Sequence, residues 1–246
     1  MSEVLVIAGS DSSGGAGLMR DVRTLASLGA GAACALTAVT AQSDATVTAI
    51  HFVPPQIIRA QIEAAFATAR VRAVKIGMLG TEAAVLAVAA ALATHAPVPM
   101  VLDPVLAASS GAALLDRQGQ AALRAVLLPR VTLLTPNIPE AAALLGRPSA
   151  SSEPELLRQG EALLSLGARA VLLKGGHDSG ALATDYLLTP GAAVLRLSAA
   201  RVAGGRRGTG CALSSAIAAG LAAGRELADA CARAKQHVTE LLQHAG

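Results

Sequence analysis

The chain contains 246 residues with a net charge of +3, and 53% of them are hydrophobic although only 1% are aromatic. This length allows a single large core. No uncharged apolar run reaches the roughly 20 residues that span a bilayer. One tyrosine and two phenylalanines are too few to form a stacking platform for single-stranded nucleic acid. Three cysteines without metal-ligand spacing suit a reducing compartment, and the chain starts without a recognisable secretory signal. We therefore expect one cytoplasmic domain over residues 1–246 that binds neither membrane nor nucleic acid.

Short apolar runs typical of buried strands alternate with longer helical segments along most of the chain. The predicted order is strand 3–8, helix 14–29, strand 32–39, helix 54–68, strand 73–77, helix 81–95, strand 99–104, helix 116–127, strand 131–136, helices 138–145 and 153–166, strand 170–176, a hairpin of 182–188 and 192–198 around the turn TPGA, and helices 209–223 and 226–243. Continuous apolar strands between helices indicate an α/β fold, with a mainly parallel sheet covered by helices on both faces.

Glycines and polar residues follow six of the predicted strands at the point where each strand ends. They are Gly9-Ser10-Asp11, Gln42, Gly77-Met78, Asp103, Asn137 with Glu140, and Lys174-Gly175-Gly176. In sheets of this kind, ligands bind beyond the carboxyl ends of the strands. The sequence therefore predicts one ligand site at this edge, with carboxylates, an amide and a lysine in it.

The segment GGRRGTGCALSSAIAAG at 204–220 places Gly208, Gly210 and Cys211 at the start of an apolar helix. A helix N-terminus has unpaired N–H groups and the positive end of the helix dipole, so it binds anions, and glycine lets a ligand approach the backbone closely. Two common nucleotide motifs are missing from the sequence, because GSDSSGGAG lacks the lysine of a P-loop and no predicted strand leads into GxGxxG. An anion site, a lysine and carboxylates are nevertheless the parts that phosphoryl transfer requires.

Six sequence blocks resemble, in the same order, those of the hydroxymethylpyrimidine/phosphomethylpyrimidine kinases of the ribokinase-like superfamily. The blocks are IAGSDSSGGAG, KIGML, VLDPV with SG after it, TPNIPEAAALLG, VLLKGGH and GTGCALSSAIA, and the resemblance runs from about residue 4 to residue 243. It implies a three-layer α/β/α fold and a homodimer. It also implies that ATP and Mg²⁺ are used to phosphorylate the hydroxymethyl group of 4-amino-5-hydroxymethyl-2-methylpyrimidine, and then to convert the monophosphate to the diphosphate in thiamine biosynthesis.

The resemblance assigns phosphoryl transfer to Gly208, Thr209, Gly210 and Cys211, whose backbone N–H groups would form an anion hole. Most of the superfamily has aspartate at the position of Cys211. A thiol at a helix N-terminus can have a lowered pKa, so Cys211 would take the proton of the acceptor hydroxyl or orient the acceptor. The alternative is a small buried cysteine that caps the helix.

The same resemblance assigns a further group of polar residues to ATP and the metal. Lys174 and Asn137, with Thr209, would contact the nucleotide phosphates, and Asp103 and Glu140 would hold Mg²⁺ directly or through water. Each polar residue that follows a strand has a structural alternative. Asn137 would cap a helix, Glu140 would sit favourably in its first turn, and Asp103 would cap a turn.

A third group of residues is assigned to the pocket for the acceptor. The carboxamide of Gln42 offers a donor and an acceptor, which matches the amino group and ring nitrogen of an aminopyrimidine. Asp21 matches a family residue that lines this pocket, and its alternative is a solvated carboxylate on a helix. Apolar walls and small residues that permit close approach complete the predicted pocket, which consists of Gln42, Asp21, Gly9, Ala16, Met78 and Val105.

Arg206 and Arg207 stand where the family usually has a Thr-His pair, and their role is left open: guanidinium suits phosphate, but a solvated loop fits equally. Two other functions are compatible with the sequence. A pyridoxal kinase of the same superfamily performs the same reaction on a hydroxymethylpyridine. A regulatory module could bind the pyrimidine without catalysis, although such a module needs neither metal-binding carboxylates nor Cys211.

Overall fold

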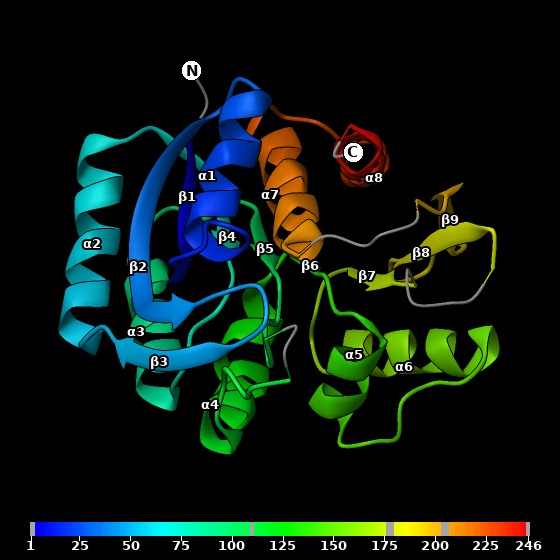
Figure 1. Cartoon of the computed structure of the whole chain (residues 1–246), viewed down its shortest axis with the longest axis horizontal. Helices are drawn as coiled ribbons and strands as arrows, with labels where there is room; N and C mark the ends of the chain where they lie inside the picture. The colour runs from blue at the N-terminus through cyan, green and yellow to red at the C-terminus, as the bar shows by residue number, and fades with distance from the viewer. Residues whose placement is uncertain (1–2, 109–110, 176–179, 203–206, 245–246) are drawn as a thin grey trace.

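The computed structural model describes residues 3–108, 111–175, 180–202 and 207–244, which form a nine-stranded sheet with helices on both faces (Figure 1). The strand order is β3-β2-β1-β4-β5-β6-β7-β8-β9. The strands are β1 (Glu3–Asp11), β2 (Gly31–Gln42), β3 (Val47–Phe52), β4 (Val71–Ile76), β5 (Met100–Leu102), β6 (Leu133–Leu134), β7 (Val171–Lys174), β8 (Leu182–Leu188) and β9 (Leu195–Ala200). The expected mainly parallel sheet is confirmed, because β2, β1, β4, β5, β6 and β7 pair in parallel.

The helices begin and end close to the predicted positions. They are α1 (Gly17–Ser27), α2 (Pro55–Thr68), α3 (Glu82–Ala93), α4 (Arg117–Ala122), α5 (Ile138–Leu145), α6 (Glu153–Ser165), α7 (Thr209–Ala222) and α8 (Leu227–Gln243). After α4 the chain continues as a π-helical turn over Leu123–Leu127, where the sequence predicts one regular helix. Among the described residues, no helix has the length and apolar character needed to cross a bilayer.

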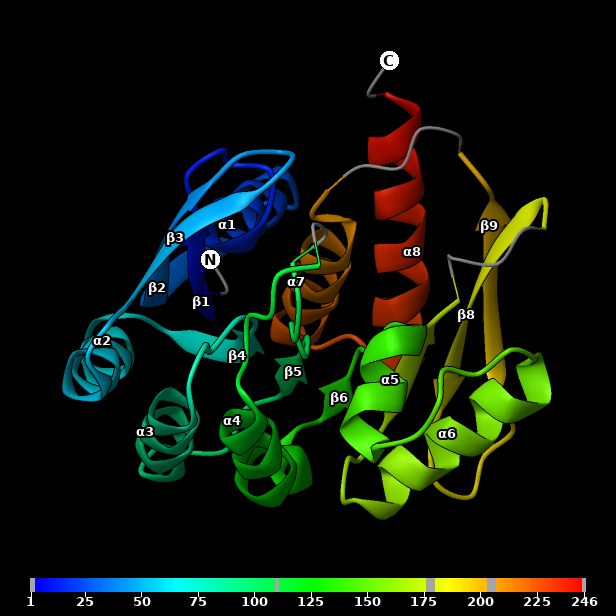
Figure 2. The ribbon, with the colours of Figure 1, turned by 60° about the horizontal axis from the view of Figure 1, so that its bottom comes forward.

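Helices α1, α7 and α8 cover one face of the sheet, and α2 to α6 cover the other (Figures 1 and 2). Val4 and Val6 of β1 belong to the core that contains α7 and α8 side chains, whereas Leu5 and Ile7 belong to the core under α2 and α3. Successive side chains of a strand point to opposite faces, so a strand covered on both faces is apolar at every position. This arrangement explains why β1 reads as an unbroken apolar run.

The edges of the sheet are antiparallel. At one edge β3 pairs with β2, and at the other the hairpin β8–β9 pairs with β7. The sequence predicts the second hairpin but not β3. Most side chains of β3 are exposed or half-buried, so this strand has no buried apolar run that would reveal it.

The carboxyl ends of β1 and β4 lie next to each other at the point where the strand order reverses. From β1 the chain passes to β2 on one side, and after β3 and α2 it returns to β4 on the other side of β1. Ligands of open α/β sheets bind at such a reversal. The fold therefore predicts that the ligand site involves the loops that follow β1, β4 and β5.

Candidate active site

A cavity of about 1060 Å³ lies at the carboxyl ends of the parallel strands. Its walls include residues from most of the chain, from Ala8 in β1 to Leu242 in α8. Of the residues that the sequence analysis assigns to the site, all but Asp21 line this cavity. They are Gly9, Ala16, Gln42, Met78, Asp103, Val105, Asn137, Glu140, Lys174, Gly208, Thr209, Gly210 and Cys211.

Lys174 lies between two carboxylates at one end of the cavity. Its Nζ, at the end of β7, donates to Oδ1 of Asp103 at 2.9 Å and lies 3.7 Å from Oε2 of Glu140. Burial alone would raise the pKa of Asp103, but the ammonium groups of Lys174 and Lys75 lower it below its usual value. Burial raises the pKa of Glu140, although Lys174 opposes this shift. Asp103 is thus held as a carboxylate beside a cation.

Asn137 and Glu140 form a capping box at the start of α5. The Asn137 Oδ1 accepts from the Glu140 backbone N–H at 2.8 Å, and the Glu140 Oε2 accepts from the Asn137 backbone N–H at 2.8 Å. This reciprocal pairing satisfies two of the backbone donors that a helix N-terminus leaves free. Both residues therefore cap α5, as the structural alternative predicts. Both also line the cavity.

The N-terminus of α7 reaches the pair formed by Lys174 and Asp103. A Cβ atom added to Gly210 would lie 3.1 Å from Nζ of Lys174 and 3.7 Å from Oδ2 of Asp103. Gly208 is the helix N-cap with a φ of 75°, and a Cβ there would lie 2.2 Å from the backbone oxygen of Gly15. Glycine is required at this position, because a side chain would meet backbone and the conformation is left-handed. The free N–H groups of α7 thus face the same cavity as the lysine.

Cys211 lies in the first turn of α7, and the predicted lowering of its pKa is wrong. Burial raises the pKa of the thiol to about 11, and the carboxylates of Asp21 and Asp103 act in the same direction. The ammonium of Lys75 and a hydrogen bond with the Gly17 backbone oppose this shift. Loss of solvation therefore outweighs the favourable position at a helix N-terminus, and the ligand-free protein keeps a neutral thiol at pH 7.

The other end of the cavity has an apolar wall beside the carboxamide of Gln42 and the ion pair of Arg207 with Asp11. Met78 packs against Ala38 and Leu114 together with Val105, and a Cβ added to Gly9 would lie 2.9 Å from Sδ of Met78. Gln42 ends β2. Its backbone N–H donates to Oγ of Ser12 at 2.9 Å, and that hydroxyl also lies 2.9 Å from the Gln42 backbone oxygen. This end of the cavity therefore combines an apolar wall with the Gln42 carboxamide, whose Oε1 accepts from Oγ1 of Thr40 at 3.2 Å, while the Gln42 backbone is held by the loop after β1.

Asp21 does not line the cavity, in contrast to its assignment from the sequence. Its side chain is fully buried behind the wall and forms an ion pair with Lys75 of β4, with 2.7 Å between Nζ and Oδ2. Oγ of Ser215 in α7 donates to its other oxygen at 2.8 Å. The carboxylate is directed from α1 toward the sheet, where it balances a buried ammonium and has no access to a ligand.

Sequence reasoning missed four charged residues of the cavity wall, which are Lys75, Asp185, Arg201 and Lys235. Lys75 stands in the apolar run of β4, where a lone lysine is itself a signal. Asp11, which the sequence places at the end of a strand, and Arg207, whose role it leaves open, also line the cavity. The side chain of Arg207 forms an ion pair with Asp11, so this arginine is not part of a solvated loop. Arg206, whose role was left open with that of Arg207, lies outside the described residues.

The donor set suits a magnesium ion that is shared with a phosphate ligand. Asp103 and Glu140 offer carboxylate oxygens on either side of Lys174. Within the described part of the chain, no three or more His, Cys, Asp and Glu side chains are grouped to hold a metal. Mg²⁺ commonly binds through one or two carboxylates, and takes its remaining ligands from water and substrate phosphates. The chemistry of these two carboxylates therefore fits a magnesium ion.

The chain is similar to several known kinases. A family model described as phosphomethylpyrimidine kinase matches residues 11–246. A hydroxymethylpyrimidine/phosphomethylpyrimidine kinase from Rhizobium meliloti (strain 1021) is 46% identical over 235 residues, which cover 95% of this chain and 88% of the relative. A thiamine biosynthesis bifunctional protein from Geobacter sulfurreducens is 42% identical over 241 residues, which cover 98% of this chain and 49% of that protein.

Two solved structures place the fold in the same group. The phosphomethylpyrimidine kinase of Clostridium difficile 630 has a TM-score of 0.86 and 37% identity, covering 98% of this chain and 100% of that one. The pyridoxal kinase of Staphylococcus aureus in complex with AMP-PCP and pyridoxal has a TM-score of 0.87 and 29% identity, covering 96% and 85%. These neighbours confirm the ribokinase-like α/β/α fold. Since the family model spans nearly the whole chain, the chain belongs to the phosphomethylpyrimidine kinase family.

Proposed function

We propose that the chain uses ATP to phosphorylate the hydroxymethyl group of 4-amino-5-hydroxymethyl-2-methylpyrimidine and then its monophosphate, as a kinase of thiamine biosynthesis. The observation that carries this proposal is the approach of the α7 N-terminus to Lys174 and Asp103, in a cavity with an apolar end near Gln42. A helix N-terminus and a lysine would neutralise charge on a phosphoryl group, and the opposite end would accommodate a flat polar ring. We therefore assign donor and acceptor to separate ends of one cavity.

The donor end supplies electrostatic stabilisation. The free N–H groups of Thr209, Gly210 and Cys211 would donate to the transferred phosphoryl group, and Lys174 would contact the nucleotide phosphates beside Asn137. Donors fixed before the reaction stabilise the charge that develops in the transition state without further reorganisation. Asp103 and Glu140 would hold Mg²⁺. When bound, the ion would neutralise phosphate charge and orient the oxygens that it contacts.

The acceptor end supplies orientation. Gln42 would pair with the amino group and a ring nitrogen of the pyrimidine, while Met78 and Val105 would cover its faces. Holding the acceptor oxygen in line with the phosphorus atom lowers the barrier by removing rotational and translational freedom in advance. A neutral Cys211 thiol favours the orienting role over that of a base ionised in the resting protein, because burial raises its pKa to about 11.

The pyridoxal kinase alternative is not favoured. A pyridoxal kinase neighbour is 29% identical, while a relative named for the pyrimidine substrate is 46% identical. The non-catalytic alternative would leave the Lys174, Asp103 and Glu140 cluster without a purpose, since binding a neutral pyrimidine requires no metal-binding carboxylates.

Counting the phosphates added to the acceptor tests the proposal. The protein is incubated with ATP, Mg²⁺ and the hydroxymethylpyrimidine, and products are identified by mass spectrometry, with pyridoxal as the competing acceptor. We expect the monophosphate first and the diphosphate later. Pyridoxal phosphate as the main product would favour the alternative kinase, and absence of any phosphorylated acceptor would favour the binding module.

Two finer features are proposed, the first from the family resemblance and the second from the cysteine content of the sequence. The protein would act as a homodimer, and it would act in the cytoplasm. Light scattering on the purified protein tests the first, since a mass of one chain would contradict it. Fractionation of cells that express the full chain tests the second, since recovery in the membrane fraction would contradict it.

A further inference from the structure

Arg207 joins three segments around the acceptor end of the cavity. Its Nη2 donates to Oδ2 of Asp11 at 3.0 Å, and its Nη1 donates to Oδ1 of Asp44 at 2.8 Å and to the Ser43 backbone oxygen at 2.9 Å. The Nη1 also lies 3.3 Å from Oγ of Ser13. One guanidinium, adjacent in sequence to the N-cap of α7, thus contacts the loop after β1 and the turn between β2 and β3.

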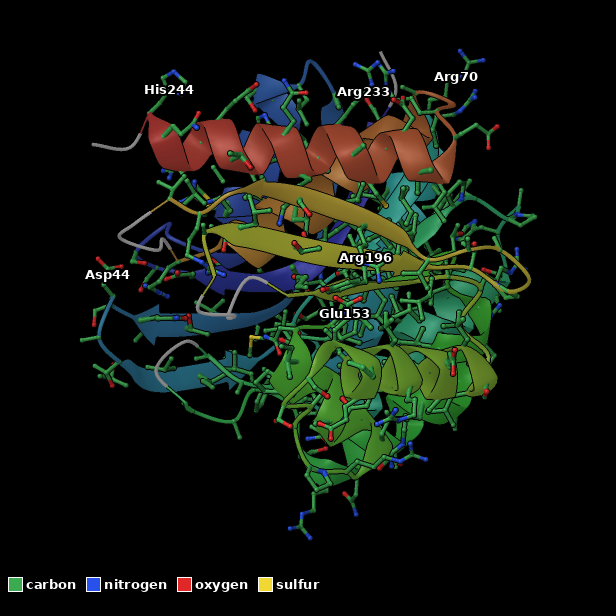
Figure 3. All side chains as sticks on the ribbon, turned by 90° about the vertical axis from the view of Figure 1, so that its right-hand side faces the viewer. Asp44, Arg70, Glu153, Arg196, Arg233 and His244 are labelled. Carbon is green, nitrogen blue, oxygen red and sulfur yellow. The ribbon has the colours of Figure 1, made fainter. Side chains whose placement is uncertain are left out.

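The two carboxylate partners of Arg207 differ in their surroundings. The Asp11 side chain is 3% exposed and also accepts from the backbone N–H groups of Ser13 and Ala16. The Asp44 side chain is 88% exposed, at the tip of the β2–β3 hairpin (Figure 3). An exposed ion pair contributes little to stability, whereas a buried partner is costly to lose. Asp11 therefore anchors the guanidinium at Nη2, whereas Nη1 can exchange its contact with Asp44 for a contact with another group.

This exchangeable contact sets Arg207 apart from the lysines of the cavity. Lys75, Lys174 and Lys235 pair with carboxylates that are at most 12% exposed. A ligand can displace Asp44 into water without leaving a buried charge unpaired. The same displacement at a lysine would strand a carboxylate in the interior.

The two proposed acceptors differ in charge at the reacting group. The first acceptor presents a neutral hydroxyl, whereas the second presents a phosphate monoester with close to two negative charges at neutral pH. Both reacting groups must approach the N-terminus of α7, since the phosphoryl group is transferred there. A guanidinium N–H forms a strong charge-assisted hydrogen bond to a phosphate oxygen, and its planar geometry lets a second nitrogen keep another partner.

We propose that Arg207 determines specificity for the phosphorylated acceptor, by exchanging Asp44 for the acceptor phosphate while Asp11 holds its other side. This inference rests on the proposed function, because it concerns the second of the two phosphorylations. It gives Arg207 a role in selecting between acceptors, and it gives Asp44 the role of a replaceable partner.

The test compares the kcat/KM values of the two acceptors in the full chain. In Arg207→Gln, the ratio of kcat/KM for the monophosphate to that for the unphosphorylated pyrimidine falls at least about tenfold, as the loss of a hydrogen bond to a charged group predicts. Arg207→Lys restores part of the ratio, since it keeps the charge but not the guanidinium geometry that contacts Asp11 and the phosphate at once. Arg20→Gln is the matched control, because Nε of Arg20 donates to Gly15 in the same loop at 3.3 Å, and it leaves the ratio within about twofold.

Two results would overturn the inference. An Arg207→Gln variant that slows both acceptors by the same factor, or that lowers the ratio by less than about tenfold, would make Arg207 a structural clamp only. A binding measurement separates the specificity role from a structural clamp. In titration calorimetry with the monophosphate alone, we expect the affinity to fall in Arg207→Gln but not in Asp44→Asn. If the wild-type protein phosphorylates neither acceptor, the proposed function itself fails, which is a different outcome.

Discussion

Nζ of Lys75 lies 2.7 Å from Oδ2 of Asp21, and neither side chain is exposed to solvent. The pair links β4 to α1, and Ser215 extends it to α7 through a hydrogen bond of 2.8 Å. Three elements that border the cavity are therefore tied together beneath its wall. A buried pair of this kind is fragile to the loss of one partner, because the remaining charge cannot be solvated.

Removing the Lys75 charge should destabilise the fold strongly. Lys75→Met leaves the Asp21 carboxylate unpaired, so we expect the free energy of unfolding to fall by about 3–5 kcal/mol in urea denaturation. Arg59→Met is the control, since it breaks the exposed pair of Arg59 with Glu63, and it should cost under about 1 kcal/mol. The double variant Lys75→Met/Asp21→Leu should recover much of the loss. Equal stability of the Lys75 and Arg59 variants would contradict the burial argument.

The thiol of Cys211 should react slowly at neutral pH. With a pKa of about 11 against an ordinary value of 9.0, about 0.1% of the thiol is ionised at pH 8, compared with about 10% of an ordinary thiol. Because the thiolate is the reactive form, alkylation by iodoacetamide should accelerate as pH rises toward 11. The measurement uses a Cys34→Ser background, since Cys34 is exposed. A rate that levels off below pH 8 would mean that the pKa of Cys211 is lowered after all.

Two substitutions of Glu140 should separate its structural role from its proposed role at the metal. Glutamine keeps the acceptor of the capping box, so Glu140→Gln should retain the stability of the wild type while the Mg²⁺ concentration for half-maximal activity rises about tenfold. Glu140→Ala should lose about 1 kcal/mol of stability as well. Thermal unfolding and a Mg²⁺ titration of activity provide the two readouts. An unchanged Mg²⁺ requirement in Glu140→Gln would remove this residue from the proposed metal site.

Alanine at the two glycines of α7 should have different effects. At Gly208 the new Cβ meets the backbone of Gly15 at 2.2 Å, so Gly208→Ala should lower stability by more than about 1 kcal/mol and abolish activity. At Gly210 the Cβ lies 3.1 Å from the flexible end of Lys174 and at an ordinary contact distance of 3.7 Å from Oδ2 of Asp103. Gly210→Ala should therefore fold normally and show weaker use of ATP. Loss of folding in both variants, seen by circular dichroism, would contradict this distinction.

The helices and parallel strands were predictable because local signals and burial agree. Asn137 followed by Glu140 predicts the start of α5 through its capping box, and the apolar run of β1 predicts a strand covered on both faces. The edge strand β3 was not predictable in the same way. It is specified by pairing with β2, which leaves no periodic pattern in six mostly uncovered residues.

The cavity wall was largely predictable from the residues that end each strand, whereas the charge pairs behind it were not. Position along the chain shows that Asp103 and Lys174 end strands, but only the packing of α1 on the sheet shows that Asp21 faces Lys75. The prediction that the pKa of Cys211 is lowered was wrong for the same reason. A helix N-terminus can be recognised from sequence, but the water excluded by neighbouring elements cannot.

The walls of the cavity extend from Ala8 to Leu242, and this has a consequence during protein synthesis. A polypeptide still growing on the ribosome can form α1 and much of the sheet, yet it lacks part of the enclosure until the last helix has emerged. Truncated translation products should therefore be unable to consume nucleotide, and catalysis should begin only once the nearly finished polypeptide has closed on itself.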